Sequence, residues 1–147
     1  MAQEKLSKLD KRIKRFNVTG LIHTLISVAM FVMTAINFAY EKEIFYYTLR
    51  GLSIATLVNS IIWLWCAIRL FIAAKQLNNP KSVKNTRVIL ALSVILVLTP
   101  DTLAVLLYWL PMLKDLVLIN IIGLISPVLV FIGWFVGKHL GKKLKKN

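Results

Sequence analysis

Four long apolar stretches alternate with short polar segments along the chain of 147 residues. They run over about Phe16–Tyr40, Leu49–Ala74, Val88–Leu113 and Leu116–Val136. A helix that crosses a bilayer needs about 20 mostly apolar residues, and each stretch is long enough. The pattern therefore predicts an all-α, polytopic membrane protein built as a bundle of four transmembrane helices.

The rest of the chain forms only short segments. We divide it into an N-terminal segment, residues 1–15, and a single transmembrane domain, residues 16–147, which includes a basic C-terminal tail. Leu6, Leu9, Ile13 and Phe16 recur at helical spacing between lysines and arginines, which predicts a short basic amphipathic helix. Such a helix could lie on an anionic inner leaflet. Alternatively, the segment only anchors the first span by its charge, and we favour this second interpretation.

The distribution of charge predicts the orientation in the membrane. The chain carries a formal net charge of +13, and 58% of its residues are hydrophobic. Basic residues gather before the first stretch, between the second and third, and after the fourth, while the other two connections are nearly neutral. Since cytoplasmic loops are rich in Lys and Arg, both termini are expected in the cytoplasm. We expect the inner (cytoplasmic) membrane of a bacterium as the location, and no binding of nucleic acid.

Four polar side chains, His23, Asn59, Arg69 and Asp101, fall within the predicted spans. Counted from the nearest inner boundary of each span, Asp101 lies ~21 Å deep and Asn59 ~24 Å, whereas Arg69 lies ~9 Å deep and His23 ~10 Å. Arg69 can reach the cytoplasmic headgroups. Asp101 is too deep for that, which leaves three alternatives: protonation, an ion pair with Arg69 through water or His23, or a polar cavity.

Asp101 stands in the motif Thr99-Pro100-Asp101-Thr102, which is also typical of a helix start. Thr suits the N-cap position, Pro suits the first helical position, and Asp in the first turn complements the helix dipole. The third span could therefore be broken at Thr99 and Pro100, as in transporters that bind ions between two half-helices. The alternative, which we favour slightly, is a kinked continuous helix with Asp101 hydrogen-bonded to Asn59, Thr102 or a neighbouring hydroxyl.

The end of the fourth span carries a possible helix-packing seam. Gly133, Gly137 and Gly141 form two consecutive G-x-x-x-G steps, which allow another helix to approach closely. The sequence leaves open whether that helix is the first span, the second span or part of another subunit.

Common catalytic and ligand-binding motifs are absent from the sequence. It has no Gly-rich phosphate loop, H-E-x-x-H, C-x-x-C or G-x-S-x-G, and Cys66 is its single cysteine. We therefore expect no enzyme activity, cofactor or metal. The favoured hypothesis is a protein that binds another membrane protein, as an accessory or assembly subunit or a toxin-immunity protein. The alternative is a small oligomeric proton-coupled transporter or channel that uses Asp101. The expected partners are the anionic inner leaflet and a membrane protein or a second copy of the chain.

Overall fold

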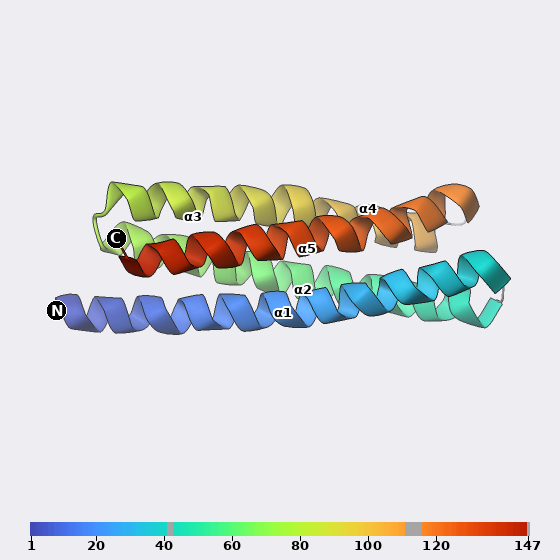
Figure 1. Ribbon diagram of the computed structural model, residues 1–147, viewed down its shortest axis with the longest axis horizontal. Helices are drawn as coiled ribbons and strands as arrows, with labels where there is room; N and C mark the ends of the chain where they lie inside the picture. Colours follow the sequence, from blue (N-terminus) through green and yellow to red (C-terminus); the bar gives the residue numbers. More distant parts are fainter. Residues whose placement is uncertain (41–42, 111–115, 147) are drawn as a thin grey trace.

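The computed structural model describes residues 1–40, 43–110 and 116–146, and this part of the chain is almost entirely helical (Figure 1). Its elements are α1 (Ala2–Tyr40), α2 (Glu43–Gln76), α3 (Pro80–Leu92), the π-helical segment η1 (Ser93–Leu98), α4 (Thr99–Trp109) and α5 (Leu116–Lys146). Because α3, η1 and α4 follow one another without interruption, they form one rod. Four helical rods are thus long and apolar enough to cross a membrane, as the sequence pattern predicts.

The four rods lie side by side, with both termini and the α2–α3 turn at one end (Figure 1). We call this end, which carries residues 2–15, 70–87 and 138–146, the basic end. α1 packs against α2 and α5, and the α3–η1–α4 rod packs against the same two helices. Within the described residues, no backbone contact joins α1 to the α3–η1–α4 rod. These two rods therefore occupy opposite corners of the arrangement.

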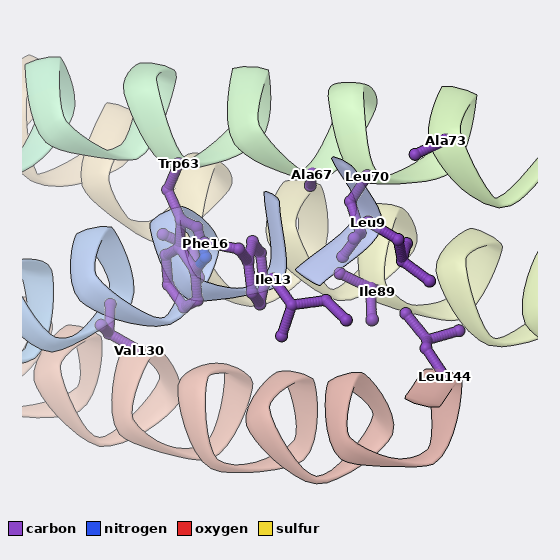
Figure 2. Packing of buried hydrophobic residues seen from close by; sticks show 11 residues of the cluster. Leu9, Ile13, Phe16, Trp63, Ala67, Leu70, Ala73, Ile89, Val130 and Leu144 are labelled. Carbon is purple, nitrogen blue, oxygen red and sulfur yellow. The ribbon is translucent and has the colours of Figure 1, made fainter. Parts of the chain in front are cut away.

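The N-terminal segment is a continuation of α1 and packs inside the basic end. Leu9, Ile13 and Phe16 are buried in a cluster with side chains of the other helices (Figure 2). The remaining buried members are Trp63, Ala67, Leu70, Ala73, Ile89, Val97, Val130 and Leu144. In the structure the apolar face of this segment is therefore used within the protein and is not presented to a leaflet surface.

Basic side chains of α1 also bond to the backbone of α2. Lys5 donates a hydrogen bond to the carbonyl of Gln76 over 3.4 Å, and Arg12 donates to the carbonyl of Arg69 over 2.7 Å. These bonds place the first turns of α1 beside the last turns of α2. Since α1 has 39 residues and is ~58 Å long, it exceeds the ~30 Å thickness of a hydrocarbon core.

The third rod is irregular just before Pro100. Proline has no backbone N–H, and its ring clashes with the carbonyl four residues earlier. The preceding turns widen into the π-helix, in which the N–H and the hydroxyl of Thr99 both bond to the carbonyl of Val94. Leu98 and Thr99 keep helical dihedral angles, φ −64°, ψ −44° and φ −65°, ψ −50°. Of the two alternatives for this span, the structure has the continuous helix, and Thr99 and Pro100 mark a π-helical irregularity rather than a gap.

Candidate functional site

A histidine and an aspartate meet between the two rods at opposite corners. His23 lies on α1 and Asp101 on α4, and their side chains are 0% and 1% exposed. The imidazole Nε2 is 2.8 Å from the carboxylate Oδ2. The line between the two atoms departs from the N–H direction of the ring, so this is a close contact rather than a well-aligned hydrogen bond.

A third helix contributes a hydroxyl to the same carboxylate. Ser126 on α5 donates a hydrogen bond from Oγ to Oδ1 of Asp101 over 3.3 Å. The two carboxylate oxygens thus face two different helices, and Asp101 links α1, α4 and α5. The order of contacts differs from that of a hydrolytic triad, in which the serine hydroxyl bonds to the imidazole and not to the carboxylate. This arrangement therefore does not activate Ser126 as a nucleophile.

Aromatic rings enclose the imidazole. The ring of Trp63 lies 5.7 Å from that of His23, centroid to centroid, and that of Phe16 lies 5.5 Å from Trp63. One turn before His23, a Cβ added to Gly20 would lie 3.0 Å from Nε1 of Trp134 and 3.2 Å from Cζ2 of Trp63. Gly20 is therefore what allows the two indoles to approach α1 beside the histidine.

The carboxylate of Asp101 lies among apolar helices. Burial away from water makes an isolated carboxylate costly, and Asp101 is the only acid in the sequence between Glu43 and Asp115. Its contacts with His23 and Ser126 offset part of this cost. Removal of one partner from such a buried pair is strongly destabilising.

Of the other two predicted polar residues, Asn59 lies near this site and Arg69 lies away from it. Asn59 donates a hydrogen bond from Nδ2 to the carbonyl of Thr19 over 3.3 Å, and Thr19 is one turn of α1 from His23. Arg69 is exposed, with its guanidinium 6.0 Å from the ring of Trp65. The pairing of Arg69 with Asp101, one of the three alternatives, is therefore not found, and the carboxylate contacts His23 instead.

The depths obtained by counting residues placed His23 at the level of Arg69 rather than of Asp101. The error comes from the inner boundary chosen for the first span. Phe16 is buried among the helices, and its ring lies 5.5 Å from that of Trp63, centroid to centroid. Counting from Phe16 therefore begins ~11 Å deeper than counting from Arg87, which is the difference between the two depths.

The three glycines of the seam face other helices of the same chain. A Cβ at Gly133 would lie 3.3 Å from Cγ2 of Val97, and one at Gly137 would lie 3.2 Å from the ring of Phe16. A Cβ at Gly141 would lie 3.8 Å from Cγ2 of Ile13, an ordinary van der Waals distance. Gly137 and Gly141 thus face α1, and Gly133 faces η1. Of the partners that the sequence left open, the first span is the one that lies against the seam in the structure.

Ser126 was not predicted as a site residue. Its only sequence signal is the neighbouring Pro127, which repeats the pairing of a polar residue with a proline seen at Pro100 and Asp101. Over the residues that the structure describes, no three His, Cys, Asp or Glu side chains gather in a way that could hold a metal ion. No protein-family model, curated protein or solved structure matches the chain.

Proposed function

We propose that the protein is a small proton-coupled transporter or channel of the inner membrane, with both termini in the cytoplasm. The observation that carries this proposal is the contact between His23 and Asp101 inside the apolar part of the helices. Ionisable groups inside a membrane are costly and commonly mark proton or substrate pathways. Their position in the middle of the spans agrees with a role in passing a proton from one side to the other.

The backbone around the pair supports movement at this point. Asp101 follows the π-helical segment and Pro100, and Ser126 precedes Pro127. Helices yield most easily where prolines and π-helical turns interrupt the regular hydrogen bonds, and such turns are frequent at functional sites. Release of the proton leaves a net negative charge on the pair, which favours hydration and separation of α4 from α1. Because four helices are few for a pathway, we expect a homo-oligomer to form it.

The proposal is tested by proton flux into liposomes that contain the purified protein and a pH-sensitive dye. Asp101→Asn removes the ionisable oxygen with little change of volume, so flux should fall to the level of empty liposomes. Glu4→Gln is the matched control, because it makes the same change at an exposed ion pair with Lys8. Wild-type liposomes that conduct no protons above the empty control, or unchanged flux in Asp101→Asn, would contradict the proposal.

A second candidate function, binding to another membrane protein, is favoured by the closure of the polar site. His23 and Asp101 are 0% and 1% exposed, and two pockets of the described residues, at the α2–α3 turn and on the outer face of α5, lie away from them. In this alternative the pair only fixes the helices, and the outer surface binds the partner as an accessory or immunity protein would. Co-purification after mild solubilisation tests it, and a solitary monomer with no co-purifying membrane protein would count against it.

A further inference from the structure

A basic pocket opens where α2 turns into α3. Its volume is about 560 Å³. The lining residues are Lys75, Asn78, Asn79, Pro80, Val83, Lys84 and Arg87. Lys84 and Arg87 stand three residues apart on α3 and therefore share a face, which Lys75 approaches from the end of α2. Three cationic side chains thus converge on one concave surface.

No carboxylate of the described residues forms an ion pair with these three cations. The sequence has no acidic residue between Glu43 and Asp101. At the basic end, Glu4 is 2.8 Å from Lys8, whose ammonium lowers the pKa of the Glu4 carboxyl. Within the described residues, the positive charge of the pocket is therefore not balanced by an ion pair, so the pocket suits an anionic ligand.

The backbone of the turn adds to the positive potential. Asn78 adopts the left-handed conformation with φ 52°, and the Asn79 side chain caps α3 by accepting a hydrogen bond from the N–H of Lys81 over 3.1 Å. α3 then begins with Pro80, so the positive end of its dipole lies at the pocket. The fixed turn holds the cations of α2 and α3 on opposite sides of the same opening.

We propose that this pocket binds the phosphate of an anionic phospholipid of the inner leaflet, of the phosphatidylglycerol class. Lys75 lies six residues after Arg69, which is ~9 Å along the helix. The headgroup layer is ~5–7 Å thick, so long cationic side chains reach back into it from this level. Juxtamembrane clusters of Lys and Arg attract anionic lipids. The inference rests on the proposed orientation in the membrane, but not on the proton chemistry of Asp101.

The test is a titration of the full chain in nonionic detergent with phosphatidylglycerol or phosphatidylcholine, with bound lipid counted by native mass spectrometry. Wild type should bind phosphatidylglycerol at least about tenfold more tightly than phosphatidylcholine. The double variant Lys84→Gln/Arg87→Gln should lose about tenfold or more of this affinity. Lys142→Gln/Lys143→Gln is the matched control, because it removes two exposed charges from α5 at the same end and should bind nearly as wild type.

Equal losses of phosphatidylglycerol affinity in the two double variants would show a diffuse attraction to the basic end and would overturn the proposal that the pocket binds the lipid. Equal binding of the two lipids would also overturn it, as would displacement of phosphatidylglycerol by millimolar inorganic phosphate, which would identify free phosphate as the ligand. Thermal unfolding checks that the variants are folded. Asp101→Asn should bind the lipid as wild type does, so a failure of the proton proposal leaves this result unchanged.

Discussion

His23 and Asp101 touch across the diagonal of the four-helix arrangement. Nε2 and Oδ2 are 2.8 Å apart, while in the described part of the chain α1 and α4 both pack on α2 and α5 and share no backbone contact with each other. A contact between diagonal helices fixes the rotation of both about their axes. The pair therefore specifies one arrangement of the helices, whatever chemistry it also performs.

The first prediction concerns the coupling between these two residues. His23→Phe and Asp101→Leu each leave a buried polar group without its partner and should lower the free energy of unfolding by about 3–5 kcal/mol. The double variant His23→Phe/Asp101→Leu should cost less than the sum of the corresponding single variants, with a coupling of about 0.5–3 kcal/mol. Unfolding by titration with sodium dodecyl sulfate, followed by tryptophan fluorescence, measures each value.

Glu4→Gln, which alters an exposed ion pair, serves as the control for this double-mutant comparison and should leave the free energy of unfolding unchanged. Additive effects of the His23 and Asp101 substitutions would show that the two side chains do not interact in the membrane-embedded protein.

The second prediction compares two glycines within helices. Gly20→Ala places a methyl group against the indoles of Trp134 and Trp63, so it should cost about 1–3 kcal/mol through overpacking. Gly51→Ala has no atom within 4 Å of the new methyl group and should be neutral or gain up to about 1 kcal/mol from helix propensity. Thermal unfolding in detergent compares them, and equal midpoints would contradict the close approach of Trp134 to α1.

The third prediction concerns the glycine seam. Gly137→Leu should destabilise the isolated chain, because the new side chain collides with the ring of Phe16 on α1. Gly141→Ala should be tolerated, since its methyl group meets Ile13 at 3.8 Å. Thermal unfolding together with size-exclusion chromatography distinguishes the possible roles of the seam. A Gly137→Leu variant of unchanged stability that loses an oligomeric state would place a second subunit, not α1, at the seam.

The sequence predicted four helices that are long and apolar enough to cross a membrane, but not which apolar residues near the end of the second one face other helices. Hydropathy measures only whether a side chain avoids water. An apolar side chain avoids water equally whether it faces lipid or the interior of a protein. Leu70 and Ala73 continue the apolar stretch of α2 and are buried in the cluster that contains Leu9 and Ile13 of α1, so they face protein. Distinctions of this kind depend on tertiary contacts, which the local sequence does not contain.

Asp101 and His23 were predicted as site residues because an ionisable side chain is energetically costly inside a membrane, and not because the sequence reveals their geometry. A carboxylate deep in an apolar span attracts attention by itself, so Asp101 was identified, and His23 with it. The choice between His23 and Arg69 as its neighbour depends on the relative axial position of α1 and α2, which follows from their packing. Ser126 was not predicted, because the hydroxyl of a serine in a membrane helix usually donates a hydrogen bond to a carbonyl of the same helix, as Ser93 does to Ile89.

The last prediction tests whether the N-terminal segment packs within the protein or on the membrane. Leu9 is 1% exposed and Leu6 is 52% exposed, although both belong to the same predicted apolar face. Leu9→Ala should therefore lower the free energy of unfolding by about 2–5 kcal/mol, because it leaves a cavity among Leu70, Ile89 and Leu144. Leu6→Ala should change it by less than about 0.5 kcal/mol. A helix on the leaflet surface would lose similar apolar contact with lipid at both positions, so equal effects of the two variants would favour the surface helix over packing in the basic end.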